Sequence, residues 1–326
     1  MNGREATARA MQVAEGEEAS VLNSPPWLAG LSVRGRLRLH EPMSRHCTWR
    51  AGGAAERLFE PVDLADLVSF LQAAPPTEPL TLVGFGSNLL VRDGGLAGTV
   101  ILTAGVFGQL RWQDEARVVA GAGVACAKVA RQAARRQLGG GEFLGGIPGT
   151  IGGALAMNAG AFGHEIWSLV EAVETLSRDG RVQKRAAAEF RANYRHVDGL
   201  NEEWFVSGTL RFDLDTGATA TVRDLLARRN ASQPLGLPSC GSVFKNPPGD
   251  FAGRLIEAAG CKGRQRGGAY VSPKHANFII NDGSASAADI EGLMLDVQQA
   301  VAAHSGQLLE TEVRILGAAL SDGEGA

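Results

Sequence analysis

The sequence has no excess of charge and no long hydrophobic run, and both absences limit what the protein can be. Its 326 residues carry a net charge of −3, so no basic field would attract nucleic acid or an acidic membrane surface. No apolar run is long enough to span a bilayer, and the first residues lack the charged-then-apolar pattern of a secretory signal. We therefore expect a cytoplasmic protein that binds no nucleic acid and is not inserted in a membrane.

Cysteine is scarce, and two common sequence patterns are missing. The four cysteines show no C-x-x-C spacing, which argues against a zinc site or a disulfide framework. We expect free thiols in a reducing compartment and no metal site. The sequence contains neither the Walker A pattern G-x-x-x-x-G-K-S/T nor an internal repeat of fixed period.

Glycine, in contrast, is concentrated in one segment, Gly139–Gly163. Ten of its 25 residues are glycine, and Glu142 is its only charged residue. So few side chains cannot form a core, yet the apolar residues present are not typical of a flexible linker. The composition predicts a backbone that passes close to another group, with glycine allowing positive φ and open N–H groups. Two interpretations stay open: a site for a large flat ligand with a pyrophosphate, or a bend between tightly packed strands.

A second glycine-rich loop, Gly84–Asn88, follows the short apolar strand expected over 80–83. This is the setting of a phosphate-binding loop. A Rossmann fingerprint would need a glycine in place of Leu89 and a helix there, which Val91–Gly95 would break. An ordinary turn between two strands remains the alternative.

A possible chemical centre lies in the segment Ser239–Pro247, which places Ser242 on an expected turn. The segment is not the G-x-S-x-G elbow of a hydrolase, because position 240 is Cys and position 244 is Phe. Taken alone, Ser242 would be interpreted as a turn or capping serine.

The hydrophobic pattern changes along the chain, and the length predicts two or three domains. Helices are predicted over 63–71, 124–136, 222–229, 252–259 and 287–303. Strands are predicted over 80–83, 99–102, 117–120, 171–177, 181–185, 204–213, 276–281 and 312–316, with Asp179-Gly180 as a hairpin turn. We place a boundary near residue 220, between a nucleotide-binding half and a compact C-terminal α+β domain.

Six motifs occur in the same order as in one enzyme family. They span Thr48–Gly53, Val83–Val91, Gly139–Gly163, Cys240–Pro247, Val271–Asn281 and Glu312–Gly317. Together they resemble the UDP-N-acetylenolpyruvoylglucosamine reductases, from about residue 31 to 317. The resemblance implies an α+β protein with a vanillyl-alcohol-oxidase/PCMH-like FAD-binding fold of two subdomains and a C-terminal α+β substrate-binding domain.

The resemblance also gives a domain order. We expect a mobile N-terminal extension over 1–26, with a short helix possible around 6–15. The remaining segments are FAD-binding subdomains over 27–103 and 104–219, a substrate-binding domain over 220–317 and a tail over 318–326.

The activity implied by the resemblance is that of an FAD-dependent oxidoreductase in peptidoglycan biosynthesis. NADPH would be the hydride donor to non-covalently bound FAD, and UDP-N-acetylglucosamine enolpyruvate would be reduced to UDP-N-acetylmuramate by a monomer. The hydride would go to the outer vinyl carbon, and Ser242 would protonate the carbon next to the carboxylate. Arg195 and Glu312 would stabilise the enol. Without the family, Arg195 and Glu312 would be interpreted as surface charges.

The resemblance assigns cofactor contacts to residues of three motifs. These are Thr48, Gly84, Gly86, Ser87, Asn88, Leu89, Gly145, Gly146, Ile147, Pro148, Gly149, Ile151, Gly152, Asn158 and Gly160. Asn246 is the implied contact to the substrate diphosphate. Lys262, in a glycine-rich loop, is a further candidate for binding the diphosphate. Arg229 and Gln233 could neutralise the diphosphate or cover a helix face. His275 could line the substrate cleft or be a packed loop histidine.

The chain departs from the family pattern at two places. His46-Cys47 stands where the family usually has Asn-Thr, so only Thr48 is retained, and Val197 replaces an expected serine. The sequence before the serine motif leaves no room for the tyrosine-bearing insertion of one subtype, so the chain resembles the shorter subtype. The alternatives are a flavin-dependent alcohol oxidase of the same fold, for which no flavin-tethering His or Cys is evident, and a non-catalytic nucleotide-binding module.

Overall fold

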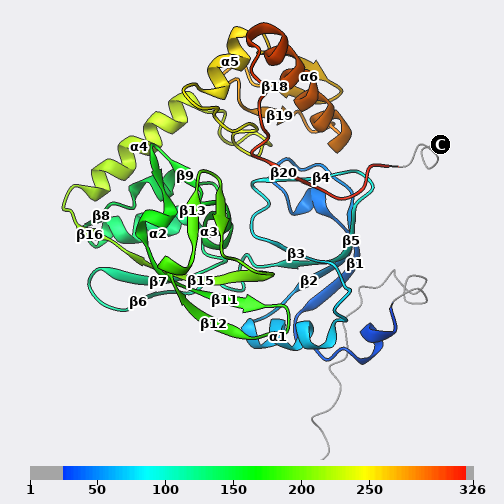
Figure 1. Cartoon of the computed structure of the whole chain (residues 1–326), viewed down its shortest axis with the longest axis vertical. Coiled ribbons are helices and arrows are strands. Elements are labelled where there is room, and N and C mark those ends of the chain that lie inside the picture. Colours follow the sequence, from blue (N-terminus) through cyan, green and yellow to red (C-terminus); the bar gives the residue numbers. More distant parts are fainter. Residues whose placement is uncertain (1–24, 321–326) are drawn as a thin grey trace, which may run out of the picture.

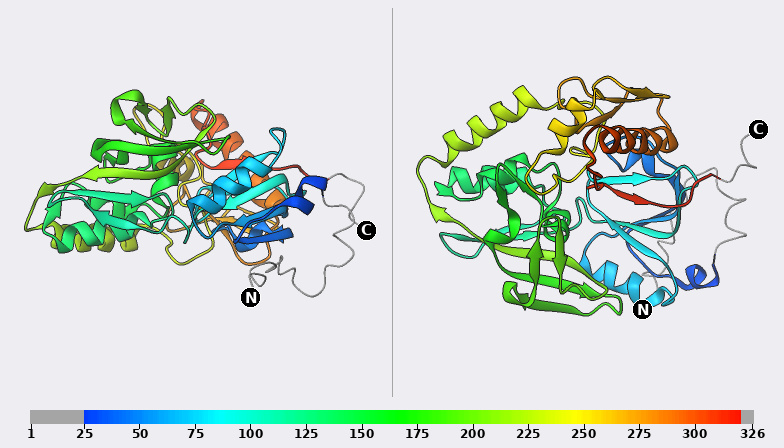
Figure 2. Two further views of the ribbon diagram at one scale, coloured as in Figure 1. Left: turned by 90° about the horizontal axis from the view of Figure 1, so that it is seen from below. Right: turned by 45° about the horizontal axis from the view of Figure 1, so that its top comes forward.

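The computed structural model describes residues 25–320, which form three units (Figure 1). Most of the predicted N-terminal extension, including the helix considered around 6–15, lies outside the described residues, as do residues 321–326 of the predicted tail. Figure 2 shows the three units from two further sides. In its right-hand view the C-terminal unit, coloured orange to red, lies above the first unit, coloured blue to cyan. None of the described helices has the length and apolar character needed to cross a membrane.

The first unit is built on a four-stranded sheet with the order β1-β2-β5-β3. Its strands are β1 (Arg36–Pro42), β2 (Ala54–Glu60), β3 (Leu80–Val83) and β5 (Leu96–Leu102). β1 is antiparallel to β2, whereas β2 and β3 are parallel to β5. Helix α1 (Leu64–Ala73) begins after Asp63, whose side chain accepts the Asp66 N–H, and packs Phe70 against Phe59. The predicted helix over 63–71 and the predicted strand over 80–83 are confirmed.

The second unit is a five-stranded antiparallel sheet with the order β12-β11-β15-β7-β6. Its strands are β6 (Leu110–Trp112), β7 (Arg117–Gly121), β11 (Val170–Ser177), β12 (Val182–Ala186) and β15 (Glu203–Arg211). Helices α2 (Cys126–Arg135) and α3 (Ile151–Met157) and the 3-10 helix η4 (Glu142–Gly146) pack against this sheet in one core. The predicted hairpin is confirmed, with Gly180 of its turn at φ +86°.

Several short elements complete the chain. Two-stranded ladders are formed by β8 (Leu138–Gly139) with β16 (Asp213–Leu214), β9 (Gly160–Ala161) with β10 (His164–Glu165), and β13 (Arg191–Asn193) with β14 (His196–Asp198). The remaining 3-10 helices are η2 (Pro26–Gly30), η3 (Met43–Arg45), η5 (Ile166–Leu169) and η6 (Ala187–Glu189). The turn of the β13–β14 ladder carries Arg195.

The long helix α4 (Ala218–Ser232) leads from the second unit to the third (Figure 1). Its first half packs Ala218 and Val222 against Ala134 of α2, so the predicted boundary near residue 220 lies within a continuous helix. The third unit contains α5 (Ala252–Ala258), β17 (Gln265–Arg266), β18 (Ala269–Val271), β19 (Ile279–Asn281) and α6 (Ala287–Ser305). The strand predicted over 276–281 is wrong in its first half, because the Phe278 N–H bonds to the His275 carbonyl in a turn.

The first and third units share a continuous core. Trp49 is fully buried, its Nε1 donates to the Ile279 carbonyl at 2.8 Å, and its own carbonyl accepts from Asn281 at 2.8 Å. Strand β4 (Leu89–Val91) pairs in parallel with β20 (Arg314–Leu316), so the last strand of the chain returns to the first unit. The strand predicted over 312–316 therefore begins two residues later.

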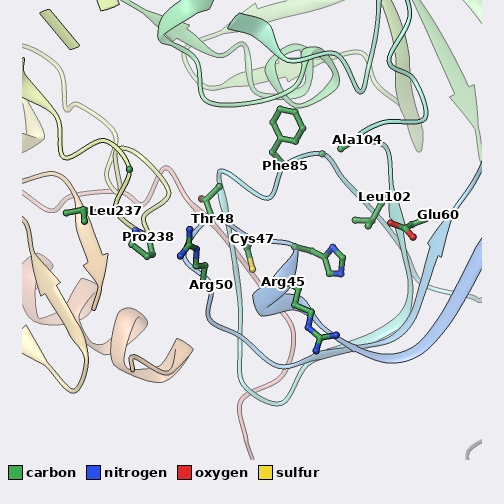
Figure 3. Close-up of a pocket in the computed structure, with 13 residues that line it drawn as sticks. Arg45, Cys47, Thr48, Arg50, Glu60, Phe85, Leu102, Ala104, Leu237 and Pro238 are labelled. Atoms are coloured by element: carbon green, nitrogen blue, oxygen red, sulfur yellow. The ribbon is translucent and has the colours of Figure 1, made fainter. Parts of the chain in front are cut away.

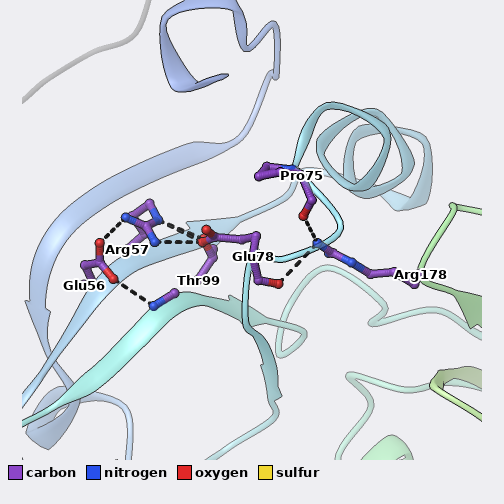
Figure 4. A network of polar contacts seen from close by, with 7 residues as sticks. Glu56, Arg57, Pro75, Glu78, Thr99 and Arg178 are labelled. Carbon is purple, nitrogen blue, oxygen red and sulfur yellow. Dashed lines mark hydrogen bonds and ion pairs between the residues drawn. The ribbon is translucent and has the colours of Figure 1, made fainter. Parts of the chain in front are cut away.

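The first and second units are joined by a polar network (Figure 4). Arg178, from the β11–β12 turn, donates to the carbonyls of Pro75 at 2.5 Å and Glu78 at 3.2 Å. The Glu78 carboxylate in turn accepts from Arg57 at 2.9 Å and from Thr99 at 2.6 Å. A single turn of the second unit is thereby fixed to the loop that leads into β3, and thus to the start of the Gly84 loop.

We expect the contact between Asp93 and α6 to be a main stabiliser of the third unit. Asp93 accepts from the N–H groups of Ala287 and Ala288 at 2.9 and 2.8 Å and so caps the helix from another unit. Asp93→Ala should lower the free energy of unfolding by about 1–2 kcal/mol, the range for a lost helix cap. Urea titration of wild type, Asp93→Ala and the control Asp224→Ala, which removes an exposed carboxylate of α4, checks this. Equal losses in the two variants would contradict it.

Candidate active site

The Gly84–Asn88 loop connects β3 to β4 and is wedged between two other segments. Gly86 has φ +59°, and a Cβ atom there would lie 2.1 Å from the His46 carbonyl oxygen, so only glycine fits. Its own carbonyl accepts the Thr48 N–H at 3.2 Å. At Gly84 a Cβ atom would lie 2.5 Å from Thr150 Oγ1. The loop is therefore held between residues 46–48 and the start of α3.

This loop carries open backbone donors. Within residues 25–320, no acceptor lies within hydrogen-bond distance of the N–H groups of Gly86, Ser87 and Asn88. The Ser87 hydroxyl lies 3.4 Å from the Cβ position of Gly149, so the two glycine-rich loops face each other. Open N–H groups without obstructing side chains fit phosphate oxygens. The residues present therefore fit the diphosphate of a dinucleotide cofactor.

Most glycines of the Gly139–Gly163 segment serve packing within the second unit. A Cβ atom at Gly146 would lie 2.6 Å from the Phe162 ring, and one at Gly152 would lie 2.7 Å from the Ala122 Cβ. A Cβ atom at Gly160 would lie 2.3 Å from the His164 carbonyl oxygen. Gly145 is buried against α2 and α4. Any cofactor contact from these glycines has to come from the backbone. The packing interpretation thus holds for these glycines, and the ligand interpretation stays open for the backbone around Gly149.

The apolar residues assigned to the cofactor are divided between core and surface. Ile147 and Ile151 are buried in the core of the second unit, and Leu89 is buried in the core of the first. Pro148 is exposed and directly precedes Gly149.

Arg195 and Glu312 form a half-buried ion pair between the second and third units. Arg195 Nε lies 2.6 Å from Glu312 Oε1, and both side chains are 15% exposed. Burial raises the pKa of the Glu312 carboxyl above its ordinary value, although the charge of Arg195 opposes this. The interpretation of these two residues as surface charges is therefore wrong. They come from segments 117 residues apart.

Ser242 lies beside the extended segment that carries Glu312. The next residue, Val243, donates to the Asn277 carbonyl at 2.9 Å and accepts the Glu312 N–H at 2.8 Å. The Asn277 side chain bonds to both backbone groups of Phe244, at 2.9 and 2.8 Å. Ser242 is half-buried and, among the described residues, its hydroxyl has no hydrogen-bond partner. The hydroxyl is therefore available to a ligand.

A cavity of about 420 Å³ opens in the third unit next to this serine. Its lining residues are Ser242, Asn246, Phe251, Gly253, Arg254, Glu257, Lys274, His275, Ala276 and Asn277. Asn246 Oδ1 accepts the first N–H of α5 at 3.0 Å. His275 Nδ1 accepts the Asn277 N–H at 3.3 Å, and burial, followed by the nearby Lys262 charge, lowers the pKa of His275. A neutral histidine with Nε2–H follows, of the kind that donates to a ligand.

The other substrate candidates lie around this cavity rather than in its wall. Lys262 pairs with Glu257 at 2.7 Å, and Glu257 does line the cavity. Arg229 donates to Gln233 at 2.9 Å at the end of α4, and burial lowers the pKa of Arg229. Sequence reasoning missed Arg254, Glu257 and Lys274, for which only adjacency to motif residues was a signal.

A second cavity, of about 560 Å³, lies between the first unit and residues 236–238 (Figure 3). Thr48 and Gly84 line it together with Phe85 and Arg50, and Figure 3 shows Phe85 across the cavity from the Thr48 loop. The unusual Cys47 of this loop is buried, and burial raises the pKa of its thiol to about 12. Cys47 is therefore a protonated core residue, and Thr48 retains access to the cavity.

Comparison with known proteins agrees with this geometry. Residues 55–185 match the model of an FAD binding domain, and residues 233–316 match that of the UDP-N-acetylenolpyruvoylglucosamine reductase, C-terminal domain. These matches confirm the predicted FAD-binding fold with a separate C-terminal domain.

Relatives and a solved structure carry the same family name. The chain is 57% identical to the UDP-N-acetylenolpyruvoylglucosamine reductase of Alkalilimnicola ehrlichii over 88% of its own length and 97% of the relative. It is 55% identical to that of Methylococcus capsulatus over 88% and 95% of the two chains. The crystal structure of the Thermus caldophilus reductase is similar with a TM-score of 0.75, at 32% identity and 87% and 99% coverage. The chain belongs to the UDP-N-acetylenolpyruvoylglucosamine reductase family.

Proposed function

We propose that this protein is an FAD-dependent oxidoreductase that uses NADPH to reduce UDP-N-acetylglucosamine enolpyruvate to UDP-N-acetylmuramate, a step of peptidoglycan biosynthesis. The observation that carries the proposal is the Arg195–Glu312 ion pair beside Ser242, since the Glu312 N–H donates to the carbonyl of Val243, the residue after Ser242. These residues meet beside the loop with open backbone donors, because Asn88 Nδ2 donates to the Glu312 carbonyl at 3.1 Å.

FAD would be held without a covalent bond between the two glycine-rich loops. The open N–H groups of Gly86, Ser87 and Asn88 would bind its diphosphate, and Gly149 leaves the opposite side free of a side chain. The chemistry that bound FAD would supply is hydride transfer from NADPH to the outer vinyl carbon of the substrate. Thr48 lines the adjoining cavity of about 560 Å³ and would make a further contact with the cofactor.

Arg195 and Glu312 would stabilise the charge that develops on the enolpyruvyl group. The ion pair already holds the guanidinium in place, so little reorganisation is needed when negative charge appears in the transition state. Burial raises the pKa of the Glu312 carboxyl above its ordinary value, so Glu312 takes up a proton more readily than a carboxyl in water, and it would share that proton with the enol oxygen.

Ser242 would deliver the proton to the carbon next to the carboxylate. Ser242 lines the 420 Å³ cavity, and its backbone is fixed by Val243, which bonds to both Asn277 and Glu312. Asn246 and His275 in the cavity wall, with Lys262 behind it, would bind the sugar nucleotide. Arg229 would add a positive charge near its diphosphate, and Gln233, which accepts from Arg229, would help to hold the guanidinium.

The two alternatives explain less. A flavin-dependent alcohol oxidase would have no use for Ser242 beside the Arg195–Glu312 pair, and a non-catalytic nucleotide-binding module would need none of these residues. We further propose that the enzyme is cytoplasmic and acts as a monomer. Size-exclusion chromatography with light scattering would test the monomeric state.

Cofactor binding by the facing loops is tested at Gly149. Gly149→Val adds a branched side chain opposite Ser87, where a Cβ atom alone would lie 3.4 Å from the hydroxyl. We expect the purified variant to lose most of its flavin absorbance while its circular dichroism stays unchanged. The control Gly30→Ala adds a Cβ atom where nothing lies within 4 Å and should keep full flavin. Stoichiometric FAD in Gly149→Val would contradict the assignment.

Proton transfer is tested by separating the two half-reactions. Reduction of FAD by NADPH needs no proton from Ser242, so Ser242→Ala should be bleached at a near-normal rate in stopped flow. Reoxidation by the sugar nucleotide should slow by about 10²–10⁴-fold, as for loss of a general acid. Ser242→Cys should recover part of this rate, and the control Ser239→Ala should behave as wild type. Equal slowing of both half-reactions would mean that Ser242 only maintains the site.

The raised pKa of Glu312 predicts a pH-dependent stability difference. A carboxyl whose pKa is higher in the folded than in the unfolded state stabilises the fold below about pH 4.3, and this contribution is lost as the pH rises through the folded pKa. The free energy of unfolding of Glu312→Gln, relative to wild type, should therefore increase between pH 4 and 7. The increase should be about 1.4 kcal/mol for every pH unit that separates the folded pKa from the unfolded pKa. A difference that stays constant over this range would show that the carboxyl is not perturbed by burial.

A further inference from the structure

Arg195 lies at the tip of a hairpin that has almost no core of its own. Tyr194 and Arg195 connect β13 to β14, all three residues of β13 are exposed, and β14 has only one half-buried residue, Val197. Arg195 itself has φ +56°, a left-handed conformation that is strained for a residue other than glycine. Such a conformation persists only where the surroundings impose it. The hairpin alone cannot fix the guanidinium.

Asn158, the residue that ends α3, holds the base of this hairpin. It is 1% exposed, and its Nδ2 donates to the Asn193 carbonyl at 3.0 Å and to Glu165 at 2.7 Å. Its Oδ1 accepts the Trp167 N–H at 3.4 Å. Its own carbonyl oxygen lies 3.5 Å from Arg195 Nη1. One buried residue therefore contacts both the hairpin base and the arginine.

The contacts on the other side of Arg195 come from the third unit. Glu312 pairs with Arg195, and the Tyr194 hydroxyl accepts the Asn246 N–H at 3.3 Å. The Arg195 guanidinium lies 4.8 Å from the centre of the Tyr194 ring. These groups set the direction of the side chain only if the hairpin is already in place, which is what Asn158 provides.

We propose that Asn158 is a positioning residue that acts through Arg195; this role rests on the function proposed above. The family resemblance assigns Asn158 to the flavin instead. Both hydrogens of its Nδ2 are used within the protein, on Asn193 and Glu165, which leaves no amide donor for a cofactor. Its left-handed backbone, with φ +43°, turns the end of α3 toward the hairpin.

The test measures the two half-reactions, reduction by NADPH and reoxidation by the sugar nucleotide, in Asn158→Gly. Glycine fits the left-handed backbone without strain, so Asn158→Gly removes the side chain and keeps the fold. We expect full FAD content and near-normal reduction by NADPH, with reoxidation by saturating sugar nucleotide slowed about 10- to 100-fold, as for a displacement of about 1 Å. The matched control Asn193→Ala removes an exposed side chain of the same hairpin, bonded only to Asp198, and should reoxidise as wild type.

A double-mutant cycle with Arg195→Lys tests whether Asn158 acts through the arginine. If it does, the double variant Asn158→Gly/Arg195→Lys should be reoxidised no more slowly than Arg195→Lys alone. Additive losses, unchanged reoxidation in Asn158→Gly, or loss of FAD from that variant would each overturn the role. Wild-type protein that the sugar nucleotide fails to reoxidise would instead overturn the proposed function, and this role with it.

Discussion

The extended segment that carries Glu312 is the constraint on which the rest of the site depends. The Glu312 N–H bonds to Val243 beside Ser242, its carbonyl accepts from Asn88 of the Gly84–Asn88 loop, and its carboxylate pairs with Arg195. One residue therefore contacts all three units by three different groups. Two residues further on, β20 pairs with β4 and fixes this segment in register. A shift of any unit relative to the others would break at least one of these bonds.

The burial of the Arg195–Glu312 pair lowers the stability of the fold. Burying a carboxylate and a guanidinium removes both from water, and the attraction between them only partly compensates. The raised pKa of Glu312 is the visible sign, because burial outweighs the field of Arg195. The left-handed backbones of Arg195 and Asn158 add strain in the same place. Strain and partial desolvation are typical of a preorganised catalytic site, in which charges are held where they are needed before the reaction begins.

The glycine-rich segment shows why composition could not decide between its two interpretations. At Gly152 the missing side chain lets α3 approach Ala122, whereas at Gly149 it keeps the space opposite Ser87 free. Both uses require the same residue type, since both need a backbone without a Cβ atom. Only the neighbours of each glycine distinguish them, and those neighbours lie elsewhere in the chain.

The sequence by itself determined the local elements, the family and the class of cofactor. The helix that begins after Asp63 and the strand over 80–83 follow from spacing and capping, which act within a few residues. The tertiary structure alone decided that Arg195 meets Glu312, that α4 continues across residue 220, and that residues 276–278 form a turn before β19. These features depend on contacts between distant segments, whose register is chosen by packing and burial and leaves no periodic signal in the chain. The motifs of the site can therefore be recognised in the sequence, whereas their geometry forms only when the three units pack together.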